Sequence, residues 1–236
     1  MRLNPAKTFR SVVAAGAFVV ALTFVAVPGM AQRAAPAGSG DPFKDTSLFK
    51  PPAGARVAII EWQDLTCPAC AHAFPIVHAA VAHYNIPLIE KDFLLPGEHA
   101  MLGNREGAIW ARYLQDKVSP KVADEYRGAV FAAQTGIESK DDMQNFTRRW
   151  FTSHGLQMPF VPDPTGQFAK EVMAEKAEGD KIGLQHTPTI IVCSAKEWVH
   201  VTDVSLLYQT IDEVEARAGA AAPVKAAATA TKKTTH

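Results

Sequence analysis

The chain of 236 residues carries 24 basic and 24 acidic side chains, and 47% of its residues are hydrophobic. This balance gives no sign of a nucleic-acid surface or of a polybasic patch that binds membranes, so no nucleic-acid partner is expected. Only three cysteines are present, so one disulfide at most can form within a single chain and one thiol is left over.

The first residues have the composition of an export signal. Arg2, Lys7 and Arg10 precede an apolar stretch over residues 12–27, and small residues follow up to Ala31. This pattern is typical of a secretory signal peptide. We therefore predict a signal peptide over residues 1–31 and a periplasmic or other extracytoplasmic location. An uncleaved membrane anchor is the alternative, because the apolar stretch is longer than usual for a signal.

Three further segments follow the signal. Residues 32–42 are rich in Ala, Pro and Gly, which predicts a flexible linker. Residues 43–217 form the predicted folded domain, which is long enough to bury an apolar interior without cysteine cross-links. Residues 218–236 are mostly Ala, Thr and Lys, which predicts a disordered tail.

The folded domain is expected to begin with a strand, a helix and a second strand. The apolar run 57–62 predicts a buried strand, and a helix is expected over residues 68–84. Pro68 would lie in the first turn of this helix, where its missing N–H removes no helical hydrogen bond. The second strand is predicted over residues 87–94, and Pro96-Gly97 ends it.

A helical insertion is expected at about residues 98–180, because apolar residues recur there at helical spacing in several separate segments. Its last helix is predicted to start after Asp163-Pro164 and to stop at Gly179. The chain then returns to strand at 189–193 and pairs back through residues 198–201 as a hairpin. Asp203 is expected to cap a final helix. This order predicts one mixed α/β domain.

The sequence Cys67-Pro68-Ala69-Cys70 stands where the first strand gives way to the helix. Two thiols at such a junction can close a small ring or hold a reactive thiolate at the helix N-terminus. Cys67, at the entry of the helix, is expected to attack or be attacked, and Cys70, one turn inside, to resolve the mixed disulfide. A static structural disulfide is the alternative, although so short a loop gives little stabilisation.

Zinc binding is a second alternative, because the spacing of the two cysteines suits zinc and His72, His78 and His83 are close in sequence. Structural zinc requires four ligands, and Cys193 is far away in a strand. We therefore predict no metal site and no cofactor, and we expect these histidines to be surface or packing residues. Cys193 is expected to be a buried apolar thiol, with an intermolecular disulfide as the alternative.

Three features together resemble the thioredoxin superfamily, and within it the exported, DsbA-like branch with a helical insertion. They are the Cys67–Cys70 motif after a strand, Glu61 six residues before the first cysteine, and the run Gly-Leu-Gln-His-Thr-Pro-Thr at 183–189 before the third strand. The resemblance covers roughly residues 56–217. It implies an α/β thioredoxin-like fold with a mixed central sheet and an inserted helical subdomain.

The resemblance also implies roles for single residues. Pro188 would be a cis-proline that faces the dithiol, Thr187 would offer its backbone to an extended substrate, and His186 would border the same surface. Glu61 would be a buried acid that accepts the proton of Cys70, with Asp64 as a weaker candidate. The alternative for Glu61 is a strand-end carboxylate that faces solvent.

Two positions depart from the family pattern. Relatives often have an Asn-Gly turn after the third strand, whereas this chain has Ser194-Ala195-Lys196, which leaves the hairpin geometry open. Strongly oxidising relatives have a histidine between the cysteines, and this chain has Ala69. The resemblance therefore implies a less extreme thiol pKa and a milder oxidant.

The implied function is thiol–disulfide exchange between Cys67–Cys70 and exported proteins. The favoured direction is a dithiol oxidase that acts on reduced or misfolded exported proteins, is reoxidised by a membrane redox partner, and functions as a monomer. The alternatives are an extracytoplasmic reductase or isomerase kept reduced by a membrane donor, and a non-catalytic thioredoxin-fold binding or chaperone module.

Overall fold

The computed structural model describes residues 43–219. The predicted signal peptide (1–31), the predicted linker (32–42) and the predicted tail from residue 220 onward lie outside the described residues. The described residues belong to one compact unit. Across residues 43–219, no helix is both long and apolar enough to span a bilayer.

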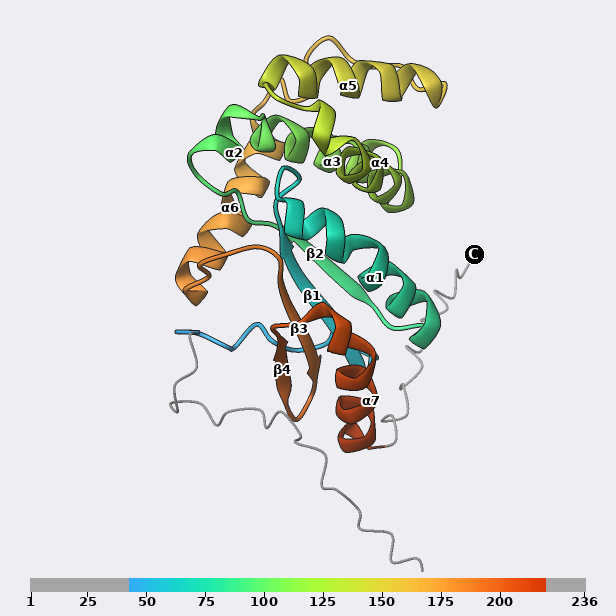
Figure 1. Ribbon diagram of the computed structural model, residues 1–236, viewed down its shortest axis with the longest axis vertical. Coiled ribbons are helices and arrows are strands. Elements are labelled where there is room, and N and C mark those ends of the chain that lie inside the picture. Colours follow the sequence, from blue (N-terminus) through green and yellow to red (C-terminus); the bar gives the residue numbers. More distant parts are fainter. Residues whose placement is uncertain (1–42, 220–236) are drawn as a thin grey trace, which may run out of the picture. The chain divides into compact units, whose positions relative to one another are not determined.

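A mixed four-stranded sheet organises the described residues (Figure 1). The strands stand in the order β2 (Leu88–Asp92), β1 (Val57–Gln63), β3 (Thr189–Ser194) and β4 (Trp198–Val201). β2 runs parallel to β1, whereas β3 is antiparallel to both β1 and β4. Every residue of β1 and β3 is buried, as expected for central strands covered on both faces. The predicted mixed sheet is confirmed.

One face of the sheet is covered by α1 (Pro68–Tyr84) and α7 (Leu207–Ala218), which lie together in Figure 1. Pro68 occupies the first turn of α1, and Asn85, with φ 50°, ends the helix in the left-handed conformation. Asp203 accepts a hydrogen bond from the N–H of Ser205 and so caps a short 3₁₀ turn, Val204–Leu206, that leads into α7. Residues one helical turn apart on α7 then bury their side chains against the sheet.

The opposite face is covered by α6 (Gln167–Ile182) and by the segment around Phe49. The predicted end of α6 at Gly179 is wrong, because the helix passes through Gly179 and stops at Gly183, with φ 95°. A Cβ at position 179 would come 2.5 Å from a ring carbon of Phe93. Gly179 therefore permits the helix to approach Phe93 closely, and it does not terminate the helix.

Most of the inserted helices lie beyond the start of α1 (Figure 1), whereas α6 runs along the opposite face of the sheet. They are α2 (Glu98–Met101), α3 (Asn104–Lys117), α4 (Pro120–Ala133), a 3₁₀ turn at Gln134–Gly136, α5 (Lys140–Ser153) and α6. Aromatic and aliphatic side chains from α3, α4 and α5 form one buried cluster that also includes Leu65 and both Cys67 and Cys70. The insertion therefore forms part of the environment of the dithiol.

Candidate active site

Cys67 is the N-cap residue of α1, with φ −82° and ψ 120°. Its backbone N–H donates to the carbonyl of Asp64 at 3.0 Å, and its carbonyl accepts from Ala71 N–H at 3.1 Å. Only 6% of Cys67 and none of Cys70 is exposed, whereas Pro68 and Ala69 between them are exposed. The first thiol therefore lies at the edge of the surface and the second lies beneath it.

The loop before Cys67 is held by the side chain of Asp64. One carboxylate oxygen accepts from the N–H and the hydroxyl of Thr66, and the other accepts from Leu95 N–H and the Asn104 amide, all at 2.7–2.8 Å. These contacts join the loop to Leu95 and to the start of α3. The structure thus places Asp64 as the residue that fixes the loop, and Glu61 remains the candidate proton acceptor.

Gln134, in the 3₁₀ turn after α4, is a further positioning residue that the sequence analysis missed. Its amide donates to the carbonyl of Leu65 at 2.8 Å and to that of Cys67 at 3.1 Å. These two bonds tie the helical insertion to the backbone on either side of Thr66. A single glutamine at the end of a helix belongs to no recognisable sequence motif, so this contact could not be predicted from the sequence.

The loop before β3 approaches the first thiol from the other side. The Thr187–Pro188 peptide bond is cis, and Cys67 Sγ donates to the Thr187 carbonyl at 3.3 Å across 120 positions of sequence. The Thr187 hydroxyl is buried and has no hydrogen-bond partner of ordinary geometry. It is therefore available to a sulfur that becomes negatively charged.

The two thiols have opposite acid strengths. The hydrogen bond from Cys70 to Cys67, followed by contributions from the Thr187 side chain and the N–H groups of Cys70 and Ala69, lowers the pKa of Cys67 to about 5 despite its burial. Burial, and then the hydrogen bond to Cys67, raises the pKa of Cys70 well above its ordinary value. At neutral pH the arrangement therefore favours a Cys67 thiolate next to a protonated Cys70.

Glu61 is wholly buried in β1, and neither of its carboxylate oxygens has a hydrogen-bond partner. Burial, and then the charge of Glu90 on the neighbouring strand, raises the pKa of Glu61 to about 8. Glu61 lies two residues after Ile59, so it projects from the face of the sheet that α1 covers. The alternative of a carboxylate facing solvent is wrong.

The remaining candidate residues are placed as follows. His186 is exposed, and its ring lies 6.0 Å from that of His200 on β4. Cys193 is fully buried on the face opposite α1, and burial raises the pKa of its thiol to about 12. An inert buried thiol was the expectation for Cys193, and its surroundings support it.

The histidines of α1 divide into two groups. His72 and His83 are exposed, as the sequence analysis expected. His78 instead faces two carboxylates, those of Glu90 and Asp124, from two other elements. His78 is a packing residue, as predicted, since its ring lies 3.9 Å from that of Phe74, but its contacts with two carboxylates were not predicted.

Comparison with known proteins bears on the fold and the family. The family model described as Thioredoxin matches residues 52–213, which is more than half of the chain. No curated protein matches the chain in a sequence search.

Several solved structures share the fold. The thiol-disulfide exchange protein alpha-DsbA2 of Wolbachia pipientis matches with a TM-score of 0.56 at 14% identity, over 70% of this chain and 85% of that one. ScsC of Proteus mirabilis, in a transitional conformation, matches with 0.53 at 16%, over 70% of each chain. A periplasmic thioredoxin-like protein of Salmonella enterica serovar Typhimurium matches with 0.54 at 14%, over 70% and 87%.

Proposed function

Because this chain belongs to the thioredoxin family and has a DsbA-like fold, we propose that it is a thiol–disulfide oxidoreductase that acts through Cys67 and Cys70. The observation that carries the proposal is the difference between the two thiols. Cys67 lies at the surface edge with a pKa of about 5, whereas Cys70 is buried and holds its proton. Such a pair provides one sulfur for attack and one for resolution.

In the oxidising direction, a substrate thiolate attacks Cys67 Sγ of the disulfide form. The Cys67–Cys70 bond breaks, its electron pair leaves on Cys70, and Cys70 takes up a proton. A second substrate thiolate then attacks the substrate sulfur of the mixed disulfide, and Cys67 leaves as a thiolate. The substrate gains a disulfide and loses two electrons, which the cysteine pair gains.

Glu61 is the proposed proton acceptor when Cys70 must become a thiolate again. Thiol deprotonation near neutral pH requires a base whose own pKa lies near that pH. The raised pKa of about 8 fits Glu61 for this role, and its buried oxygens have no other hydrogen-bond partner. Asp64, whose oxygens are occupied by the loop, does not have this freedom.

The direction that we propose is oxidation. A stabilised thiolate at Cys67 is a good leaving group and favours the reduced form of the protein, which makes its disulfide an oxidant. The low pKa arises without a side chain at position 69, because Ala69 contributes only its backbone N–H. The main contributors are instead Cys70 and Thr187.

The proposed substrates are reduced or misfolded exported proteins, bound as extended segments beside the Thr187–Pro188 loop, with His186 at its border. We place the protein in the periplasm or another extracytoplasmic space, delivered by the signal at residues 1–31. The proposed working unit is a monomer with its folded domain at 43–217 and the insertion at about 98–180. A membrane redox partner would reoxidise it.

A redox titration against glutathione tests the direction. The oxidase proposal predicts a midpoint well above the value of about −270 mV that is typical of thioredoxin. A midpoint close to that value would reject the oxidase in favour of the reductase or isomerase.

Peptide oxidation and insulin reduction test the chemistry itself. Cys67→Ser should abolish both reactions, whereas Cys193→Ser, the matched control, should leave both unchanged because Cys193 lies on the other face of the sheet. A wild-type protein that is inactive in both assays would contradict the proposed function and favour a binding module.

A further inference from the structure

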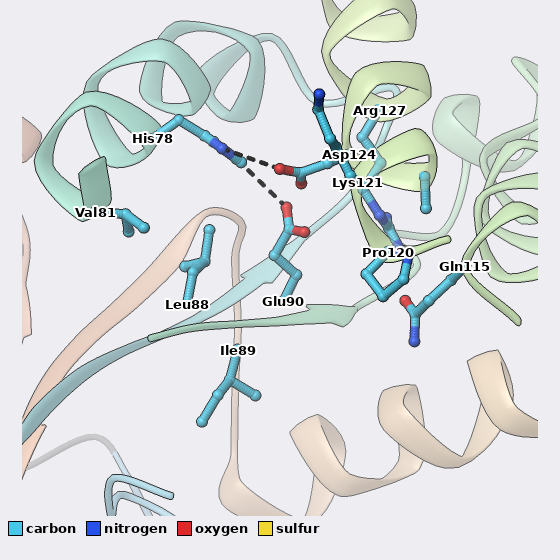
Figure 2. A pocket seen from close by; sticks show the side chains of 11 residues that line it. His78, Val81, Leu88, Ile89, Glu90, Gln115, Pro120, Lys121, Asp124 and Arg127 are labelled. Carbon is cyan, nitrogen blue, oxygen red and sulfur yellow. Dashed lines mark ion pairs between the residues drawn. The ribbon is translucent and has the colours of Figure 1, made fainter. Parts of the chain in front are cut away.

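A cavity of about 470 Å³ lies away from the dithiol, between α1, β2 and α4 (Figure 2). His78 enters it from α1, Glu90 from β2 and Asp124 from α4, and Figure 2 shows the imidazole directed at both carboxylates. The cavity is open enough to admit water and small solutes. Three side chains from three elements thus meet at one wall.

The three side chains are close enough to share one ion. His78 Nδ1 lies 3.4 Å from Asp124 Oδ2, and His78 Nε2 lies 3.7 Å from Glu90 Oε1. One ligand atom from each residue lies within 4.8 Å of the other two. Nitrogen and oxygen ligands lie about 2.0–2.2 Å from Zn²⁺, so tetrahedral ligand atoms are about 3.4 Å apart.

We propose that His78, Glu90 and Asp124 bind a divalent transition-metal cation of the Zn²⁺ type in this cavity. One imidazole with two carboxylates is a ligand set that favours such a cation over Mg²⁺ or Ca²⁺, which prefer oxygen ligands alone. Three protein ligands leave at least one coordination position open to water or to an anion from the cavity.

The charge around the cavity independently favours a cation. Glu61, wholly buried and without a hydrogen-bond partner, is the register neighbour of Glu90, so both side chains project from the same face of the sheet. Glu61 holds its proton at neutral pH, so the carboxylates that face the imidazole are those of Glu90 and Asp124 alone. A divalent cation would offset the negative charge of these two carboxylates.

The positive groups nearby are already engaged or distant. Arg127 is buried and donates to both carboxylate oxygens of Asp92, at 2.7 and 3.2 Å. Lys121 lines the cavity, but 86% of its side chain is exposed and its nearest acid is Glu125, at 3.7 Å. Arg127 therefore acts on Glu90 only through its charge, and the hydrogen bond that Glu90 Oε1 accepts, at 2.8 Å, comes from the uncharged amide of Gln63.

A closed ion pair, with a protonated His78 held between the two carboxylates, is the competing explanation. It would require both ring N–H groups to donate hydrogen bonds at roughly 2.7–3.2 Å. Both separations are longer, and the buried His78 Nε2 has no hydrogen-bond partner. Neither contact is therefore a hydrogen bond of ordinary length, and the three side chains do not form a closed, hydrogen-bonded ion pair.

Calorimetric titration of the oxidised protein with ZnCl₂ tests the proposal. In the disulfide form, Cys67 and Cys70 have no thiolate to offer, so zinc binding at the dithiol does not interfere. We expect one saturable site per chain. His78→Gln and Asp124→Asn should each weaken binding by at least about tenfold, since even the partners that orient metal ligands contribute that much.

Two control variants match these substitutions in type and element. His83→Gln removes an exposed histidine from α1, the helix that carries His78. Glu125→Gln removes the carboxylate next to Asp124 in α4. Neither should change zinc affinity. With CoCl₂ as the probe, the wild type should develop visible absorption bands of nitrogen- and oxygen-ligated cobalt, and His78→Gln should lose them.

The proposal fails if the wild type shows no one-to-one binding of ZnCl₂, or if Asp124→Asn and His78→Gln bind it as tightly as the wild type. Circular dichroism establishes that each variant is folded. Should His78→Gln not fold, Asp124→Asn decides, because that side chain is 37% exposed and tolerates an amide. The titration does not depend on thiol exchange, so either outcome leaves the proposed exchange activity untouched.

Discussion

Two buried carboxylates on neighbouring strands, Glu61 and Asp92, have opposite surroundings. No more than 1% of either residue is exposed. The Asp92 carboxylate accepts two hydrogen bonds from the guanidinium group of Arg127, at 2.7 and 3.2 Å. It also lies 3.6 Å from Nη2 of Arg112. Glu61 receives no hydrogen bond at all.

Burial alone therefore does not assign a role to an acid. The guanidinium groups of Arg127 and Arg112 offset the loss of water around Asp92, which joins β2 to helices α3 and α4 of the insertion. Glu61 has no such partner, so its pKa rises to about 8 and its protonation changes near neutral pH. The first carboxylate is structural, and the second is suited to move a proton.

The largest expected effect concerns the ion pair between Asp92 and Arg127. Arg127→Met leaves the buried Asp92 without its main partner, and the free energy of unfolding should fall by about 3–5 kcal/mol. Urea denaturation measures this loss. Lys121→Met, an exposed lysine of the same helix, should change stability by less than about 0.5 kcal/mol. Equal losses in the two variants would contradict the structural role of the Asp92–Arg127 pair.

The next largest effect concerns the proposed role of Glu61 as a proton acceptor. Glu61→Gln removes the proposed proton acceptor, and thiol exchange should slow by about 100-fold, while stability should not fall because no ion pair is broken. Stopped-flow measurement of exchange at pH 7 gives the rate. Asp92→Asn is the matched control, since it should lower stability and leave the rate per folded molecule unchanged. A Glu61→Gln protein with the wild-type rate would remove Glu61 from the mechanism.

The pH dependence of stability reports on the proton that Glu61 holds. Folded Glu61 holds its proton up to about pH 8, whereas the unfolded value is 4.5. Between these values the folded state binds more protons, so its contribution to stability is complete below pH 4.5 and is lost as the pH rises through 8. The slope from this one group is at most about 1.4 kcal/mol per pH unit.

The oxidised protein is the right form for this measurement. In the reduced protein, the lowered pKa of Cys67, about 5 against 9.0, contributes a slope of opposite sign between those two values. Urea denaturation of the oxidised wild type and of oxidised Glu61→Gln, from pH 5 to 8, should show a steeper loss in the wild type. Parallel curves would mean that Glu61 does not hold a proton in this range.

The smallest expected effect concerns the partner of the thiolate. Thr187→Val keeps the shape of the side chain and removes its hydroxyl, which contributes less than Cys70 to the low pKa of Cys67. The pKa of Cys67 should rise by no more than about one unit, or 1.4 kcal/mol. The pH dependence of alkylation by iodoacetamide measures it. Thr210→Val, equally buried in α7, should not shift the alkylation midpoint.

Local features of the chain were predictable from the sequence. The start of α1 follows from Pro68 after an apolar strand, and the bounds predicted for that helix, 68–84, agree with the structure. The hairpin of β3 and β4 also forms with Ser194-Ala195-Lys196 in place of the Asn-Gly turn, because Ser194 Oγ accepts from the N–H groups of Lys196 and Glu197.

Features that depend on distant contacts were not predictable in this way. The end of α6 was placed at Gly179 because glycine commonly follows a helix, yet this glycine is inside the helix, where it permits contact with Phe93. Gln134 and the direction of His78 carried no local signal, since their partners come from other elements.

The sequence by itself determined the order of the elements, the position of two thiols at a helix N-terminus, and the presence of an acid in the first strand. Only the tertiary structure decided that Asp92 has a guanidinium partner and Glu61 has none, and that His78 meets Glu90 and Asp124 at a cavity. The physical reason is that helix starts depend on neighbours in sequence, whereas loss of water and charge pairing depend on residues that only folding brings together.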